Sequence, residues 1–163
     1  MQKLLLVFVA AAGLAGVAFG KEFKLPDADN AYASVEIPDT WKAETYDKGV
    51  EAVSKDGEVY LAIETAGGDS LDKSIDDAMA YLKKQGVTVD DDKAETTEAK
   101  LGDMAVVRTN WPGKDEDGPC RVTLSIVAVS KGKGLLVIYW ASPKGDEANS
   151  KDLDAIANSI TPL

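Results

Sequence analysis

The sequence predicts an α+β domain in which a largely antiparallel β-sheet is flanked by helices on both faces, an α/β/α sandwich. Three observations predict this class. Residues 121–141 read as a hairpin whose second arm, LLVIYWA, is apolar on both faces, so both faces must be covered. The other predicted strands follow one another across short turns, which favours antiparallel pairing. Two amphipathic helical patterns, one in mid-chain and one near the end, supply the apolar surfaces that would cover the sheet.

The first twenty residues have the pattern of a secretory signal peptide. A lysine is followed by a long unbroken apolar run, and Ala18 and Gly20 are the small residues that signal peptidase requires. We therefore expect cleavage before Lys21, a periplasmic or secreted protein, and a single domain over residues 21–163. The alternative is an uncleaved anchor. No later stretch approaches the roughly 20 apolar residues of a membrane span.

The first half of the domain reads as strands followed by a helix. Residues 31–37 alternate between apolar and polar side chains, the pattern of a half-buried strand. The breaks that end in Gly49 and Gly57 are typical of tight hairpins. The expected strands cover residues 22–25, 31–37, 41–46, 50–54 and 58–65, and the expected helix covers residues 71–82, with Asp69 or Ser70 as its cap and Gly86 as its stop.

The second half reads as more strands and a closing helix. The run PGKDEDGP at residues 112–119 predicts a loop, because proline, glycine and acidic residues dominate it. The expected elements are a short strand from residue 87, a pairing of residues 93–100 with 104–111, the hairpin 121–141, and a helix with Ser150 as its cap, an apolar stripe of Leu153, Ile156, Ala157 and Ile160, and an end at Thr161 and Pro162.

Composition narrows the classes of function. The net charge is −10, and close to −11 without the lysine of the leader, which disfavours nucleic acid and anionic lipid surfaces as partners. Cationic ligands, divalent metals and basic proteins stay open. The chain has no histidine, which removes the commonest general base and the imidazole ligands of zinc and copper. A single cysteine, Cys120, excludes an internal disulfide and fits a small buried side chain or a link between molecules.

Several segments resemble the PsbP-like family, which also includes DcrB-like proteins of the bacterial envelope. The resemblance spans about residues 31–160 and is carried by ASVEIPDTW, SKDGEVYLAIE, SLDKSIDDAMAYL, RVTLSIVAVSKGKGLLVIYWAS and LDAIANSI. It implies a PsbP-like α/β/α sandwich and a small non-enzymatic accessory, assembly or binding protein. It brings no catalytic residues. Photosystem members handle calcium or manganese partly through histidine, which this chain lacks.

The first candidate ligand site combines Arg108, Arg121 and Trp111. The chain has only two arginines, and both fall on predicted neighbouring strands, where they would form one polar patch near a sheet end. The planar guanidinium suits carboxylate or phosphate capture. Trp111 precedes the predicted loop and is a candidate for stacking on a ligand at a pocket rim. The alternatives are structural salt bridges for the arginines and packing for the tryptophan.

The second candidate site is acidic. Asp115, Glu116 and Asp117 in the predicted loop, and the run of aspartates at residues 90–92, offer the oxygen ligands that calcium prefers. Their order does not match an EF-hand loop, and the alternative is solvated loop charge. No other cofactor is indicated.

Three functions follow from these observations. The first is an exported accessory protein of the bacterial envelope that acts through contacts with another envelope protein. The second is a carrier of a small ligand or divalent cation. The third is a hydrolase with two carboxylates, although no motif singles out a pair and no serine elbow or phosphate loop is present. The identity of the ligand or partner and the oligomeric state stay open.

Overall fold

The computed structural model describes residues 20–67 and 70–163, so the predicted signal peptide lies outside the described residues except for Gly20. Eleven strands and three α-helices build the described part, in two antiparallel sheets. The larger sheet has the order β3-β4-β5-β10-β9-β8-β6, with β7 also paired to β8. Its strands are β3 (Lys42–Tyr46), β4 (Gly49–Val53), β5 (Val59–Ala66), β6 (Thr88–Val89), β7 (Glu95–Leu101), β8 (Met104–Asp115), β9 (Gly118–Ser130) and β10 (Lys133–Ala141).

A second, small sheet was not expected. Its order is β1-β2-β11, and β2 is the central strand. The predicted first two strands are therefore present but pair with each other and with the C-terminal end, not with the large sheet. The bounds are β1 (Gly20–Leu25), β2 (Ala33–Pro38) and β11 (Thr161–Pro162).

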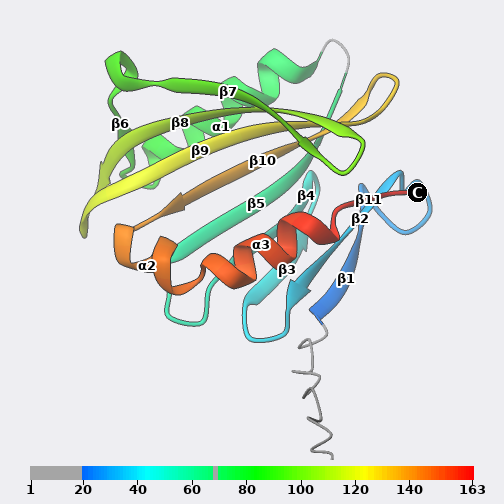
Figure 1. Ribbon diagram of the computed structural model, residues 1–163, viewed down its shortest axis with the longest axis horizontal. Coiled ribbons are helices and arrows are strands. Elements are labelled where there is room, and N and C mark those ends of the chain that lie inside the picture. The colour runs from blue at the N-terminus through cyan, green and yellow to red at the C-terminus, as the bar shows by residue number, and fades with distance from the viewer. Residues whose placement is uncertain (1–19, 68–69) are drawn as a thin grey trace, which may run out of the picture.

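Helices cover both faces of the large sheet, as predicted. Figure 1 shows α1 (Leu71–Lys84) behind the sheet and α3 (Ser150–Ser159) in front of it. On β10, Leu136 and Ile138 join the apolar cluster that contains Leu82 of α1. Leu135 belongs to the other cluster, which includes the small sheet and Ile156 of α3. The central strand is thus buried on both faces because each face meets its own layer.

The predicted loop at residues 112–119 is mostly strand, which corrects the prediction from composition. The β8–β9 ladder continues through Pro112 opposite Arg121 to Asp115 opposite Gly118. The Asp115 carboxylate accepts hydrogen bonds from the backbone N–H groups of Asp117 and Gly118, at 3.0 and 3.1 Å. Gly118 has a φ of 128°, which a side chain would resist. Local bonding therefore closes a tight turn where the composition suggested a longer loop.

The helix ends differ from the prediction in their caps. The hydroxyl of Ser70 donates to the carbonyl of Gly67 and that of Ser150 to the carbonyl of Glu147, so neither side chain caps a helix N-terminus. Asp69 lies outside the described residues. A short helix before α3, α2 (Pro143–Ala148), was also not expected; Ser142 caps it through the N–H of Gly145 at 2.9 Å. A 3-10 turn, η2 (Asp91–Lys93), contains Asp91 and Asp92 of the aspartate run, and Asp90 directly precedes it.

Candidate functional site

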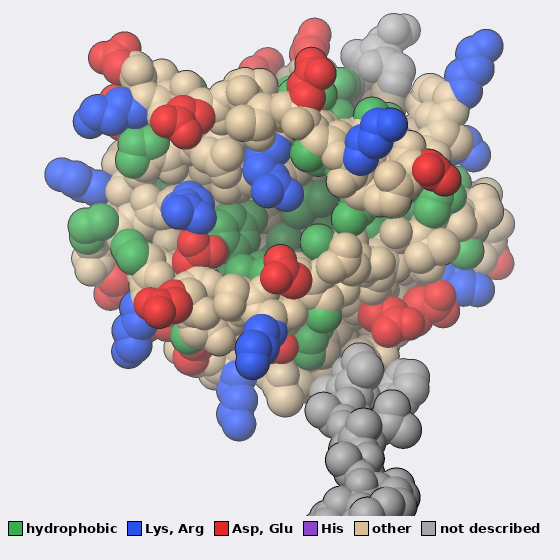
Figure 2. Space-filling model, viewed as in Figure 1, with side chains coloured by type: hydrophobic (Ala, Val, Ile, Leu, Met, Phe, Trp, Pro, Cys, Tyr) green, Lys and Arg blue, Asp and Glu red, His purple; other side chains and the backbone are tan. Residues whose placement is uncertain are grey.

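A cleft of about 270 Å³ opens between the large sheet and helix α3. Figure 2 shows it as a hollow with apolar side chains at its bottom and basic and acidic side chains around it. Its lining comes from β5, β7, β8, β9, β10, α2 and α3. The apolar part includes Leu61, Ile63, Leu101, Val106, Val127, Val137, Leu153, Ile156, Ala157 and Ile160, and the polar part includes Lys100, Arg108, Asn110, Arg121, Thr123, Ser125, Tyr139, Asp146 and Asp154.

Both arginines face this cleft, as the predicted polar patch requires. Strand alternation places Arg108 on the cleft face of β8, and Arg121 on the same face of β9. Arg108 lies opposite Ser125, and Arg121 lies opposite Pro112. Four residues of β9 therefore separate the backbone positions of the two arginines, about 13 Å of extended strand. The two arginines line one cleft, but their side chains have different partners, Ser125 for Arg108 and Asp146 for Arg121.

Within the described residues, the partner of Arg108 is a neutral group. The Nε of Arg108 donates to the hydroxyl of Ser125 at 3.3 Å, and Ser125 is itself buried. Next to them the buried hydroxyl of Thr123 donates to the side-chain oxygen of Asn110 at 2.8 Å. In the described parts of the chain Arg121 is ion-paired and Arg108 is not. The guanidinium of Arg108 is thus aligned by Ser125 and still carries an uncompensated charge.

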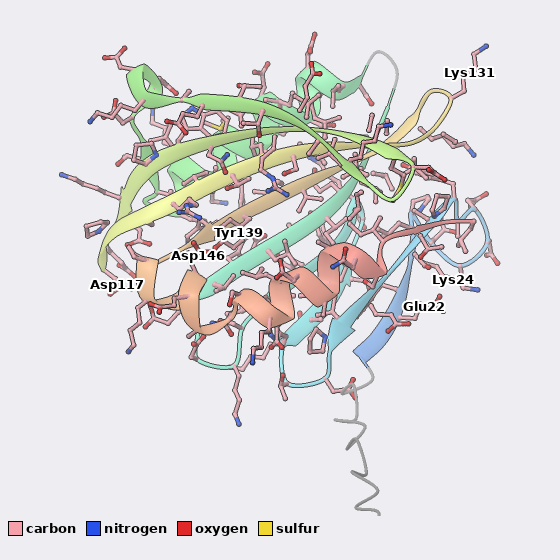
Figure 3. All side chains as sticks on the ribbon, viewed as in Figure 1. Glu22, Lys24, Asp117, Lys131, Tyr139 and Asp146 are labelled. Carbon is pink, nitrogen blue, oxygen red and sulfur yellow. The ribbon has the colours of Figure 1, made fainter. Side chains whose placement is uncertain are left out.

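Arg121 belongs to a network at the α2 end of the cleft. It donates to one carboxylate oxygen of Asp146 at 2.7 Å, and the hydroxyl of Tyr139 donates to the other at 2.6 Å. Figure 3 shows Tyr139 and Asp146 side by side at this end. Burial, reinforced by the bond to Asp146, raises the pKa of Tyr139 above its ordinary value. The tyrosine therefore stays a neutral donor and the aspartate an acceptor.

Helix α3 forms the opposite wall because it is tied to the rest of the molecule. Ile156 and Ile160 are buried in the cluster beneath the cleft, whereas Leu153 and Ala157 are half-buried along it. The indole N–H of Trp41 donates to the Asp152 carboxylate at 3.0 Å. Trp41 itself is buried, so it anchors the start of the helix to the core.

Trp111 does not join this cleft, so the predicted trio is divided. It lies one residue past Asn110 on β8, and its ring therefore packs on the α1 side with the cluster of Val122 and Leu124. At the sheet end it lines a separate shallow hollow that also includes Arg121. Strand alternation places Arg108 and Trp111 on opposite faces, so Trp111 does not line this cleft. A stacking role at the rim of the hollow that it shares with Arg121 stays a prediction.

The acidic candidates lie at the edges of the molecule. Asp115, Glu116 and Asp117 occupy the β8–β9 turn, and Figure 3 shows Asp117 at that end, away from the middle of the cleft. The Asp115 carboxylate is engaged by the turn's own N–H groups. Within residues 20–67 and 70–163, no three acidic or cysteine side chains are grouped so that they could hold a metal. The geometry therefore gives the predicted cation site no support.

Cys120 is buried on the α1 side of β9, as expected for a small apolar side chain. Burial, with a smaller contribution from the charge of Asp115, raises the pKa of its thiol to about 11. The thiol is therefore protonated at neutral pH and poorly placed to link two molecules.

Tyr139, Asp146 and the α3 wall complete the site, and the sequence analysis did not assign them to it. The stripe of Leu153, Ile156, Ala157 and Ile160 predicted a helix but not that part of its apolar surface stays open to a cleft. Asp146 lies in α2, a short helix that has no clear signal in the sequence. One signal for Tyr139 was present in the sequence. Tyr139 alternates with Val137 on one face of β10, and Val137 lies opposite Ser125, the residue of β9 that faces Arg108.

Within residues 20–67 and 70–163, no helix is both long enough and apolar enough to cross a membrane.

Comparison with known proteins gives the fold. No protein-family model matches the sequence, and no curated protein matches it. A crystal structure from Bacteroides thetaiotaomicron VPI-5482 superposes with a TM-score of 0.60 at 16% identity, over 88% of this chain and 48% of that one, so the chain spans about half of that protein. LpqN of Mycobacterium tuberculosis, described as involved in cell envelope biogenesis, superposes with a TM-score of 0.55 at 15% identity. The match covers 88% of this chain and 91% of LpqN.

The third similar structure is cyanobacterial PsbP (CyanoP) from Synechocystis sp. PCC 6803. It gives a TM-score of 0.58 at 11% identity and covers 95% of this chain and 99% of that one. The mostly antiparallel sheet, the helices on both of its faces and these likenesses agree with the resemblance found in the sequence: the chain has the PsbP-like fold.

Proposed function

We propose that this is an exported, non-enzymatic accessory protein of the bacterial envelope that works by holding a ligand in the cleft between the large sheet and α3. The leader pattern of the first twenty residues supports export. The fold shared with LpqN, a protein of cell envelope biogenesis, supports an accessory role in the envelope. The periplasm, or the medium, is the expected compartment.

The observation that carries the proposal is the composition of the cleft. Both arginines of the chain line it, above an apolar floor that includes Leu61 and Val127. Ligand sites are typically apolar concavities with a few fixed polar groups. The aligned Arg108 and the satisfied pair of Tyr139 and Asp146 are groups of that kind.

A carboxylate-based hydrolase has less support. The acids among the described lining residues are Asp146 and Asp154. Both oxygens of Asp146 already accept hydrogen bonds, from Arg121 and Tyr139. In a catalytic carboxylate pair, one carboxyl group must exchange a proton with the substrate. Asp146 is poorly placed for this role because its hydrogen bonds to Arg121 and Tyr139 already occupy both oxygens.

Contact with another envelope protein was the leading prediction from the sequence. In the described part of the chain, no exposed apolar patch marks where such a partner would bind. Among the described residues the exposed large apolar side chains are Val107 and Leu163, which lie on different elements. Isolated apolar side chains of this kind are normal on a monomer surface. The cleft is therefore the better-supported binding site, and a protein partner stays a prediction.

The proposal is tested by native mass spectrometry of the protein exported with its own leader. The variant Ala157→Phe places a large ring on the half-buried, cleft-facing side of α3. Ala155→Phe places the same ring on the exposed side of the same helix and is the matched control. We expect a bound mass on the wild type and on Ala155→Phe that is absent from Ala157→Phe. A wild type without any bound mass, or a bound mass equal on all three proteins, would contradict the proposal.

A further inference from the structure

The charge of the cleft differs in sign from the charge of the chain. The whole chain carries −10, yet the charged lining residues are Lys100, Arg108 and Arg121 against Asp146 and Asp154, a local sum of +1. Screening limits the reach of the distant acids to about 8 to 10 Å at ordinary salt. An anionic group in this cleft therefore meets a local field that the net charge of the protein does not predict.

The two arginines are not equivalent as anion sites. The charge of Arg121 is neutralised at 2.7 Å by Asp146, which is also held by Tyr139. Among residues 20–67 and 70–163, Arg108 donates through Nε to the hydroxyl of Ser125, and its two terminal nitrogens have no hydrogen-bond partner there; the side chain is exposed. These two nitrogens form a fork that matches two oxygens of a carboxylate or a phosphate, and the single charge of Arg108 balances the single charge of a carboxylate.

Apolar surface begins next to Arg108. Val106, two residues earlier on the same face of β8, lies opposite Val127 of β9. The floor continues to Ile63 and Val137, and Leu153 of α3 faces it from the wall. A ligand whose head binds Arg108 thus has its next atoms on an apolar path. The volume of about 270 Å³ is just under the roughly 300 to 1,000 Å³ of typical small-molecule sites and suits one chain, not two.

We infer that the cleft binds a single-chain amphiphile with a carboxylate head, of the free fatty-acid class. The head pairs with Arg108, the tail lies along the floor under α3, and Ser125 orients the guanidinium. Binding is reversible and involves no covalent step. This inference rests on the proposed function, because it names the ligand class of the same cleft.

The experiment is a calorimetric titration of the exported protein, after removal of bound lipid, with decanoate. Decanol has the same chain without the charge, decyltrimethylammonium reverses the charge, and acetate is a head without the chain. We expect decanoate to bind and the other three to bind at least about tenfold more weakly, because one charge-assisted pair and one buried chain each contribute that much. Decyl phosphate serves as the alternative oxyanion and is expected to bind no more tightly than decanoate.

Four variants locate the head. Arg108→Gln is expected to lose about tenfold or more in decanoate affinity, whereas Arg108→Lys, which keeps the charge, recovers part of it. Lys131→Gln removes a charge from the exposed β9–β10 turn, and we expect no change. Arg121→Gln is expected to lose less affinity than Arg108→Gln, because Arg121 lies four residues farther along β9 and its loss acts on the head only from a distance, through the Asp146 charge that it leaves unpaired. Melting temperatures check that each variant is folded.

The results separate this inference from the proposed function. Equal binding of decanoate and decanol, no loss in Arg108→Gln, tighter binding of decyl phosphate, or no binding of decanoate overturns the carboxylate inference. If the native mass spectra still show a ligand that Ala157→Phe excludes, the cleft remains the binding site for another ligand. If Ala157→Phe binds decanoate as Ala155→Phe does, the cleft is not the binding site and both fail.

Discussion

Arg108 and Arg121 illustrate how much the neighbours of a side chain decide what it can do. Both were candidates from the sequence because they are the only arginines and lie on neighbouring strands. The sequence could not show that Asp146, 25 residues beyond Arg121, would neutralise one of them and leave the other with Ser125. Alternation alone places Trp111 and Arg108 on opposite faces of β8, so the sequence already separates these two side chains.

Cys120 gives a prediction at the level of one residue. Burial holds the pKa of its thiol at about 11, above the ordinary value of 9.0. At about pH 8 this lowers the reactive thiolate fraction roughly 100-fold, since each unit of pKa changes it about tenfold. We expect iodoacetamide to modify the native protein at least that much more slowly than the urea-unfolded protein, as measured by intact mass.

The raised pKa of Cys120 also makes the stability of the protein depend on pH. The folded protein keeps the thiol proton up to about pH 11, whereas the unfolded chain loses it near 9.0. The folded state therefore binds more protons in this interval, and the contribution of Cys120 to stability falls as the pH rises through it. Equal alkylation rates for the native and unfolded protein would show that the thiol is accessible and that burial does not protect it.

At the scale of the elements, strand β10 shows why the sheet needs layers on both faces. Leu135 and Leu136 are both fully buried, one in each apolar cluster. We expect Leu135→Ala and Leu136→Ala each to lower the free energy of unfolding by about 2 to 5 kcal/mol, the cost of a cavity in a packed core. Chemical denaturation measures this.

The exposed Val107 of β8 supplies the control for these variants. Val107→Ala is expected to change the free energy of unfolding by less than about 0.5 kcal/mol, since the side chain is 39% exposed. If either leucine variant lowered the free energy of unfolding as little as Val107→Ala does, that face of β10 would not be covered by a packed layer.

Asp56 links two elements and gives a prediction for acid conditions. Its carboxylate accepts from the hydroxyl of Ser54 and from the side-chain amide of Asn149. These bonds hold the pKa of Asp56 below its ordinary value. The folded state therefore favours the charged form, and the resulting stability is present above the unfolded pKa and lost as the pH falls.

We expect Asp56→Asn to make the melting temperature less dependent on pH between about pH 5 and about pH 3, where aspartates titrate. Asp103→Asn, at the exposed β7–β8 turn, is the matched control and should keep the wild-type slope. If the melting temperature of Asp56→Asn fell with pH as steeply as that of the wild type, the hydrogen bonds of Asp56 would contribute nothing to stability in acid.

Element by element, periodicity predicted well and local chemistry predicted poorly. The strands of the meander and of the final hairpin were expected close to their observed positions, because apolar alternation reports burial directly. The caps at Ser70 and Ser150 were wrong because each hydroxyl found a nearer carbonyl. The α2 helix, only six residues long, has too few positions to show a helical period.

At the scale of the whole molecule, the arrangement of the layers creates the cleft. The resemblance in the sequence predicted the fold, and the likeness to CyanoP and LpqN agrees with it. The small sheet of β1, β2 and β11 was missed because strand alternation shows which residues face a core but not which strand is the neighbour. Its last strand has two residues and no pattern of its own.

The cleft depends on the same long-range arrangement. Its lining joins Leu61, Arg108, Tyr139 and Ile156, which come from four elements spread over the chain. The polar half was predictable in part, because Arg108 and Arg121 lie on neighbouring strands. The apolar wall was not, because whether α3 seals the sheet or leaves a gap depends on tertiary packing alone.

A methyl-resolved NMR titration of the protein with decanoate shows directly whether the cleft is the binding site. We expect chemical-shift changes confined to the cleft, at Val106, Val127, Val137, Leu153 and Ile156, with a shift of the Arg108 Nε–H signal. Methyl groups of Leu82 and Leu136, on the α1 face, should stay unchanged. Changes centred on the α1 face, on the acidic turn at Asp115, or nowhere would contradict the assignment of the cleft as the binding site.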